Sequence, residues 1–380
     1  MENKIQLYQV ELELTSDDDQ QLRSLTDRIR EEADDSTGWK RLGKLLLKIG
    51  QFNKAEELYN VLLEQISDEG GKAYYYNQLG SVHSDQGNYE TAICYFEQGI
   101  EIFEKTLPSN HPDVATSYNN IGLVYNTMGE YSKALSYYEK ALEIRQKTLP
   151  SNHPSLATSY NNIGLVYNNM GEYSKALSFQ EKALEIKQKT LPSNHPDLAT
   201  SYNNIGSVYD NMGEYSKALS YYEKDLEICE KTLPSSHPDL ATSYNNIGLV
   251  YDNMGEYSKA LSSHEKALEI QQKTLPSNHP LLAASYNNIG SVYDNMGEYS
   301  KALSYHKKAL EIQRKTLPSN HPDLATSYNN IGWVYRSMKD YSKALSYYER
   351  AQDINQRTLP PTHPHIKSVK ESIEFVKKKL

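Results

Sequence analysis

Small and hydrophobic residues recur at three- and four-residue spacing along most of the chain, most clearly between positions 115 and 144. The first half of this stretch places five residues on one side of a helix: Ala115, Tyr118, Ile121, Gly122 and Tyr125. The second half repeats the pattern with Tyr131, Ala134, Tyr138, Ala141 and Leu142. Between them, "NTMGEY" contains Gly129, which can adopt the left-handed conformation that ends a helix. The sequence therefore predicts two amphipathic helices joined by a tight turn.

The helix pair returns at a fixed interval. A histidine followed by proline occurs at positions 111, 153, 195, 237, 279, 321 and 363, always 42 residues apart. A fixed period of this size is typical of stacked supersecondary units, each burying its apolar face against its neighbours. The sequence predicts an elongated helical array.

The segment "TLPSNHPD" separates consecutive pairs. Because proline disfavours helical geometry at the preceding residue, His195 is expected just outside a helix, with Pro196 at the first helical position. Asp197 then places a negative charge at the helix N-terminus. The loop histidines are expected to be structural, since stacked units hold them about 10 Å apart or more, too far to share a metal. We predict no metal site and no cofactor.

The spacing of Tyr118, Gly122, Gly129, Ala134 and Tyr138 within the unit resembles the tetratricopeptide repeat. The eight added linker residues, with H-P-D-x-A and then Asn-Asn, resemble the kinesin light chain subtype of that repeat. The resemblance implies an all-α fold: a right-handed α-solenoid of about eight helix pairs, with a concave groove lined by the first helix of each pair.

We expect four segments along the chain. Residues 1–37 form a short β-like N-terminal stub and an acidic helix, 38–114 two divergent repeat units, 115–358 six 42-residue units, and 359–380 a C-terminal capping helix. In the first segment, "LYQVELELTSDDDQQL" is similar to the joint between an arginine-type ADP-ribosyltransferase and a repeat tail. Glu11-Leu12-Glu13 has the ExE form of that family, but the Arg- and Ser-bearing strands are absent.

No phosphate-binding, zinc-protease or nucleophile-elbow motif occurs in the chain, so we expect a protein without catalytic activity. The expected function is a protein–protein interaction scaffold that binds peptide segments of partner proteins in the groove. Two alternatives remain: a kinesin light chain-like cargo adaptor, and the C-terminal repeat region of an ADP-ribosyltransferase that lacks its catalytic domain here.

Candidate binding residues lie on the first helix of each pair, where the spacing of Thr200, Asn203, Ser207 and Asp210 places them on one face. The resemblance implies that this face lines the groove and that its asparagines hold the backbone of a ligand, since an amide both donates and accepts. The alternative is that these amides bond to one another between units. The predicted groove residues are Asn119, Asn120, Asn161, Asn162, Asn203, Asn204, Asp210, Asn245, Asn246, Asp252, Asn287, Asn288, Asp294, Asn329, Asn330, Trp333 and Arg336.

The Asn-Asn pair is identical in six units, whereas its neighbours vary. The three aspartates predict a mildly acidic wall, and hence neutral or basic peptide ligands. Trp333 and Arg336 lie one turn apart and are residue types common at interface anchors. Alternatively, Trp333 packs on the C-terminal helix near Ile366 and Ile373.

Three substitutions interrupt the repeat. Asp225 stands where other units have Ala141, Ala183, Ala267 and Ala309. Because an unpaired buried carboxylate costs several kcal/mol, we expect either a partner for Asp225 or a weak fifth unit. His264 and His306 replace a core tyrosine and are expected to be satisfied interface residues.

The net charge of −9 is concentrated in an acidic stretch over 11–35, and no basic face appears between the ends. We therefore expect no nucleic-acid partner and no membrane partner. The chain has no long apolar run, no secretion-signal pattern at its start and only two cysteines, Cys94 and Cys229. These features predict a cytoplasmic protein with both cysteines buried or half-buried in helices. They leave the oligomeric state open.

Overall fold

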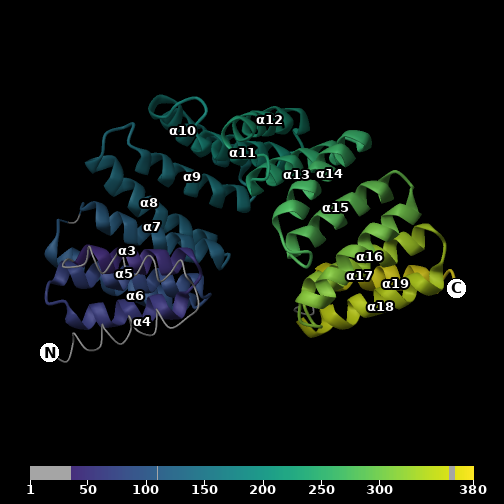
Figure 1. Ribbon diagram of the computed structural model, residues 1–380, viewed down its shortest axis with the longest axis horizontal. Helices are drawn as coiled ribbons and strands as arrows, with labels where there is room; N and C mark the ends of the chain where they lie inside the picture. The colour runs from purple at the N-terminus through teal and green to yellow at the C-terminus, as the bar shows by residue number, and fades with distance from the viewer. Residues whose placement is uncertain (1–35, 109, 359–363) are drawn as a thin grey trace. The chain divides into compact units, whose positions relative to one another are not determined.

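The computed structural model describes residues 36–108, 110–358 and 364–380, and these residues form seventeen α-helices and no strand (Figure 1). The all-α class predicted from the sequence is confirmed. The expected β-like stub and the similarity to an ADP-ribosyltransferase joint lie outside the described residues. The chain divides into two compact units, Met1–Thr190 and Leu191–Leu380, and each is described separately.

The described part of the first unit consists of antiparallel helix pairs, each packed on the next. The pairs are α3 (Ser36–Lys48) with α4 (Phe52–Gln65), α5 (Glu69–Asp85) with α6 (Tyr89–Thr106), α7 (Pro112–Thr127) with α8 (Tyr131–Thr148), and α9 (Pro154–Asn169) with α10 (Tyr173–Thr190). The first helices of successive pairs also contact one another, as α7 does with α5 and α9.

The second unit continues the same pattern and ends in a single helix. Its pairs are α11 (Pro196–Asn211) with α12 (Tyr215–Thr232), α13 (Pro238–Asn253) with α14 (Tyr257–Thr274), α15 (Pro280–Asn295) with α16 (Tyr299–Thr316), and α17 (Pro322–Ser337) with α18 (Tyr341–Thr358). The last helix, α19 (Pro364–Lys377), packs on α18. The tandem helix pairs confirm the predicted α-solenoid class.

Small residues bring the two helices of a pair close together. The ring of Tyr138 on α8 lies over Gly122 on α7, where an added Cβ would stand 2.8 Å from the ring. Ala134, one turn earlier on α8, is fully buried, and Tyr138 is almost fully buried. The repeated glycine therefore marks the crossing point at which one aromatic side chain fills the space between two backbones.

The turn inside each pair has the predicted conformation. Gly129 has φ of +77°, and the backbone N–H of Glu130 donates to the carbonyl of Tyr125 at 2.9 Å. Glycine avoids the steric cost of this left-handed geometry. In the last pair the same position is Lys339, which has φ of +60°.

The linker histidine also has the predicted place, and the structure shows what it does there. Helix α11 begins at Pro196, and His195 precedes it as the N-cap residue. Its Nδ1 accepts a hydrogen bond from the backbone N–H of Asp197 at 3.1 Å. The other five histidines described at the start of a 42-residue unit bond in the same way, at positions 111, 153, 237, 279 and 321. The cap satisfies an N–H that the helix itself leaves unpaired.

The two cysteines differ in their surroundings. Cys229 is buried, as expected, but Cys94 is exposed, so that part of the prediction is wrong. Cys94 lies on the outer side of α6, away from the positions that face the core. Within the described ranges, no helix is both long enough and apolar enough to cross a membrane.

Candidate binding face on the first helices

All predicted groove residues lie on the first helix of a pair, and every asparagine among them is half-buried. We call the surface that they form within each of the two compact units the first-helix face. It consists of Asn119 and Asn120 on α7, Asn161 and Asn162 on α9, Asn203, Asn204 and Asp210 on α11, Asn245, Asn246 and Asp252 on α13, Asn287, Asn288 and Asp294 on α15, and Asn329, Asn330, Trp333 and Arg336 on α17.

Neighbouring first helices are linked by amide–amide hydrogen bonds. In the first unit, Nδ2 of Asn162 donates to Oδ1 of Asn119 at 3.0 Å. In the second unit, Nδ2 of Asn246 donates to Oδ1 of Asn203 at 2.7 Å. The structural role that the sequence left open is therefore present. Because an amide has two N–H groups and two acceptor lone pairs, a single bond leaves further capacity on each side chain.

The aspartates at the C-terminal end of the face are also engaged with neighbouring helices. Asn295 Nδ2 lies 3.0 and 3.2 Å from the two carboxylate oxygens of Asp252, and Asn253 Nδ2 lies 3.5 Å from Asp210. Burial raises the pKa of Asp210, and the bond from Asn253 opposes that effect. Both carboxyl groups therefore accept hydrogen bonds from asparagine side chains of the next first helix.

Asp294 differs from the other two aspartates. Its Oδ1 is buried and has no hydrogen-bond partner among the described residues. Burial raises the pKa of its carboxyl group, whereas a hydrogen bond from the Trp333 side chain acts in the opposite direction. Asp294 therefore links α15 to the anchor residue predicted on α17.

Second-helix histidines hold the first asparagine of two units. Nδ1 of His264 lies 3.0 Å from Oδ1 of Asn245, and His306 lies 2.9 Å from Asn287 in the same way. Burial lowers the pKa of each histidine to about 4, so both rings are neutral at pH 7. The expectation that these histidines are satisfied is only half right, because Nε2 of His264 is buried without a partner among the described residues.

Exposed hydrophobic side chains accompany the asparagines. Three residues after the second asparagine, Leu123 is 50% exposed, Leu249 is 40% exposed and Trp333 is 47% exposed. Each lies one helical turn from the amides. The first-helix face thus combines half-buried amides with apolar side chains that remain open to contact.

Trp333 is 47% exposed, and it is not among the residues of the hydrophobic core at the end of the second unit, which includes Ile373. Instead, the guanidinium of Arg336 lies 4.9 Å from the Trp333 ring centroid and 3.9 Å from that of Phe375 on α19. The indole keeps nearly half of its surface open.

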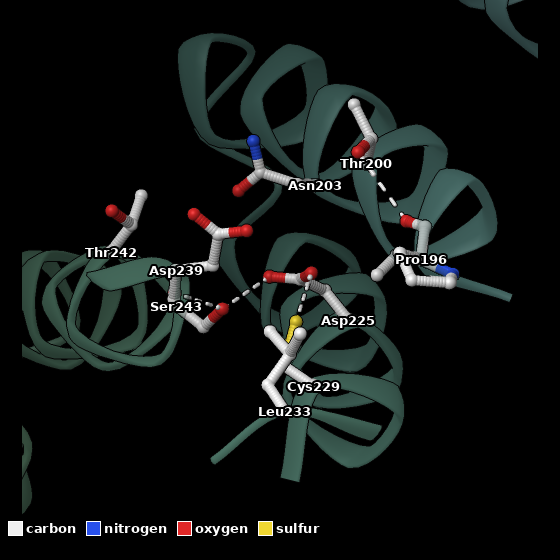
Figure 2. A pocket seen from close by; sticks show the side chains of 10 residues that line it. Pro196, Thr200, Asn203, Asp225, Cys229, Leu233, Asp239, Thr242 and Ser243 are labelled. Atoms are coloured by element: carbon white, nitrogen blue, oxygen red, sulfur yellow. Dashed lines mark hydrogen bonds between the residues drawn. The ribbon is translucent and has the colours of Figure 1, made fainter. Parts of the chain in front are cut away.

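A pocket of about 210 Å³ opens between α11, α12 and α13 (Figure 2). At its base lies Asp225 on α12, which is only 5% exposed. Its carboxylate accepts a hydrogen bond from the Ser243 hydroxyl at 2.7 Å and a longer one from the Cys229 thiol at 3.5 Å. The other polar residues of the lining are Thr200, Asn203, Asp239 and Thr242. Asp225 therefore has partners, as one of the two sequence alternatives required.

Burial and neighbouring carboxylates change the pKa values of Asp225 and Cys229 at the bottom of the pocket. Burial raises the pKa of Asp225, and the bonds from Ser243 and Cys229 only partly oppose it. Burial, followed by the charge of Asp225, raises the pKa of the Cys229 thiol to about 12. The thiol therefore remains protonated and donates its hydrogen to the carboxylate.

A second recess occupies the equivalent place in the last repeat, between α17, α18 and α19. Its lining residues Asn329, Asn355 and His365 lie three periods after Asn203, Cys229 and Asp239. The recess measures about 90 Å³. Sequence reasoning missed both recesses. It identified Asp225 as an unusual residue at a helix crossing. The sequence could not show that Asp225 also lies at the base of a pocket, because that depends on where the next helix packs.

Solved structures with the same fold include proteins of different kinds. The apo form of the quorum sensor NprR from B. thuringiensis aligns with a TM-score of 0.67 at 18% identity, over 92% of this chain and 98% of its own. The apo form of RapI gives 0.59 at 19% identity, over 93% and 98%. A putative kinesin light chain from Podosopora anserina with nearly identical TPR-like repeats is 29% identical over 54% of this chain and 98% of its own, with a TM-score of 0.49.

A search among curated proteins returned no match. The model of the tetratricopeptide repeat, by contrast, matches seven overlapping segments: residues 34–105, 71–147, 113–189, 155–231, 197–273, 239–315 and 281–357. These matches include all the helix pairs described above, together with the glycine crossings and the turns between helices. The chain belongs to the tetratricopeptide repeat family.

Proposed function

We propose that this protein is a non-catalytic interaction scaffold whose first-helix face binds extended peptide segments of partner proteins. The observation that carries the proposal is the arrangement on α11 and α13. There the amides of Asn203 and Asn246 are held in place by their mutual hydrogen bond, and the exposed side chain of Leu249 lies one turn away.

An extended peptide needs both kinds of contact. Its backbone presents a donor and an acceptor at each residue, and an amide side chain can pair with either. The bond between Asn203 and Asn246 fixes the rotamers of both side chains before a ligand arrives, which reduces the entropy lost on binding. Exposed Leu249 then offers apolar surface to a ligand side chain.

The charge of the face favours neutral or basic peptides. Asp210, Asp252 and Asp294 place three carboxyl groups on successive first helices of the second unit. A basic segment would gain from this field, and the gain would weaken as salt is added. A cargo adaptor of the kinesin light chain kind is a narrower form of the same proposal and would use the same face.

A peptide array probed with the full chain and with the variant Asn246→Ala tests the proposal. The variant removes the amide that orders Asn203, and we expect several-fold weaker binding of the peptides that the wild type retains. Gln272→Ala is the matched control, because it removes an exposed amide on α14 that bonds to the Tyr286 hydroxyl, away from the first-helix face. Equal loss in both variants, or no loss in either, would contradict a binding role for the face.

A further inference from the structure

The pocket between α11, α12 and α13 differs from the rest of the first-helix face because a buried charge lies at its base. Asp225 is 5% exposed, and both of its oxygens face neutral donors, the Ser243 hydroxyl and the Cys229 thiol. No lysine or arginine lines the pocket, and among the described residues Asp225 forms no ion pair. A buried carboxylate is normally paired with a cation, because its desolvation is otherwise uncompensated.

The second carboxylate of the pocket adds to the negative potential. Asp239, at the start of α13, lines the mouth of the pocket. His237 lies beside it, with Nδ1 3.7 Å from a carboxylate oxygen of Asp239, and the same nitrogen accepts the hydrogen bond that caps the helix. Figure 2 shows Asp225, Asp239 and Asn203 directed toward the same space.

The chain contains its own uncharged version of this pocket. In the recess between α17, α18 and α19, Ala351 stands three periods after Asp225, and His365 stands three periods after Asp239. The recess therefore occurs in more than one repeat. Asp225 lies on α12 where other units have alanine, whereas an aspartate at the position of Asp239 recurs in other units as Asp113, Asp197 and Asp323. Alanine at the equivalent position in other units also shows that the fold does not need a carboxylate there.

The size and polarity of the pocket define what it can hold. A volume of about 210 Å³ is below the range of roughly 300–1,000 Å³ for sites of drug-sized ligands, so one side chain fits better than a whole small molecule. A guanidinium binds a carboxylate best when both carboxylate oxygens are free to accept its two parallel N–H bonds. Both oxygens of Asp225 already accept a hydrogen bond. An ammonium is a compact charge with three donors, which can be shared among Asp225, Asp239 and the Asn203 carbonyl oxygen.

We propose that this pocket is the specificity subsite of the first-helix face and that it takes the ammonium group of a lysine side chain from the bound peptide. The assignment rests on the proposed function for the peptide, but the pocket itself can be tested without one. The lysine stem runs along Thr200 and Thr242 at the pocket walls, and the ammonium replaces water beside the two carboxylates.

The first experiment uses n-butylammonium as a mimic of the lysine side chain. Methyl NMR signals of Ala199 and Leu233, which line the pocket, are followed during a titration of the full chain. We expect saturable shifts with n-butylammonium, none with 1-butanol at the same concentrations, and none with n-butylammonium in Asp225→Asn or Asp225→Ala. Absence of shifts in the wild type, or equal shifts in the variants, would overturn the subsite.

The second experiment uses peptides retained by the wild type on an array, each synthesised with lysine, arginine, acetyl-lysine or norleucine at every basic position. We expect acetylation of one particular lysine to weaken binding about tenfold, the effect of losing one charge-assisted hydrogen bond. The same acetylation should have no effect on binding to Asp225→Ala. Melting curves of both Asp225 variants establish that they are folded.

The outcomes separate the two proposals. If peptides bind in a manner sensitive to Asn246→Ala but show no preference for lysine, the lysine subsite is wrong and the peptide-binding face stands. If n-butylammonium binds to the wild type but not to the Asp225 variants, and no peptide binds to the wild type, the assignment to a peptide lysine is overturned together with the proposed function.

Discussion

The side chain of Asn246 donates a hydrogen bond of 2.7 Å to the side chain of Asn203, which lies 43 residues earlier in the chain. The separation is one repeat plus one residue, so the second asparagine of one unit meets the first asparagine of the unit before it. Asn162 and Asn119 repeat the relationship in the other half of the chain. In these two places the repeated Asn-Asn pair therefore joins successive repeats.

From the hydrogen bond between the Asn246 and Asn203 side chains, we expect a modest and local loss of stability in Asn246→Ala. A hydrogen bond between half-buried neutral groups contributes about 1 kcal/mol, and Asn203 can bond to water after the substitution. We expect faster amide hydrogen exchange in α11 and α13, with little change in α17. A loss above about 3 kcal/mol would mean that the pair is mainly structural, and the binding role would lose its basis.

Asp225→Ala is expected to raise the melting temperature at pH 7. Burial raises the pKa of Asp225 in the folded protein, so its favourable contribution is fully present below the ordinary carboxyl pKa and is lost as pH rises through the folded value. As the pH rises toward 7 the wild type therefore loses this contribution, whereas alanine has no carboxyl group to titrate. In the variant the Ser243 hydroxyl is expected to donate to the Asp239 backbone carbonyl instead, which lies 3.0 Å from it in the wild type.

The gain from Asp225→Ala should shrink as the pH is lowered toward 4, because protonation relieves the wild type of its buried charge. Melting curves of both proteins from pH 4 to 7 give this difference directly. A melting temperature that is unchanged or lower at pH 7 would show that the bonds from Ser243 and Cys229 fully offset the desolvation of Asp225.

The buried histidines predict loss of stability in acid. His264 and His306 have pKa values of about 4 in the folded protein, below the ordinary value of 6.5. Their neutral forms stabilise the fold fully above pH 6.5, and this contribution is lost as pH falls from 6.5 toward 4. At one pKa unit per 1.36 kcal/mol, each histidine accounts for about 3 kcal/mol at the acid end.

Replacing both histidines with tyrosine is expected to reduce the loss of stability as the pH falls. Tyrosine occupies the same position in other units, as Tyr138 and Tyr222, and packs there against the same glycine of the first helix. Chemical denaturation at pH 7 and at pH 5 measures the effect. If the double variant loses as much stability as the wild type between these pH values, the histidines are not responsible for the acid sensitivity.

Trp333 is expected to emit as a water-exposed indole. It is 47% exposed and is in contact with the guanidinium of Arg336, which also lies over Phe375. In a Trp39→Phe background, Trp333 is the remaining tryptophan, and iodide should quench it efficiently. Phe375→Ala should shift its emission very little. A large red shift in that variant would show that α19 shields the indole after all.

The sequence by itself determined the helix pairs, their period and their ends. The 42-residue spacing of His-Pro, the glycine at each crossing and the glycine at every turn but the last, where Lys339 stands, are local signals. Each acts within one repeat on backbone conformation or close approach. They act in the same way wherever the repeat occurs, so the positions of Gly122, Gly129 and Pro196 were predicted correctly.

The tertiary structure decided which groups meet across repeats. Three contacts join helices of different repeats. Asn246 donates a hydrogen bond to Asn203, Ser243 donates one to Asp225 at the base of the pocket, and Arg336 stacks on Phe375. Periodicity places each side chain on a face of its own helix, but the rotation and distance between helices set the partners. For this reason the sequence predicted the first-helix face and missed the pocket within it.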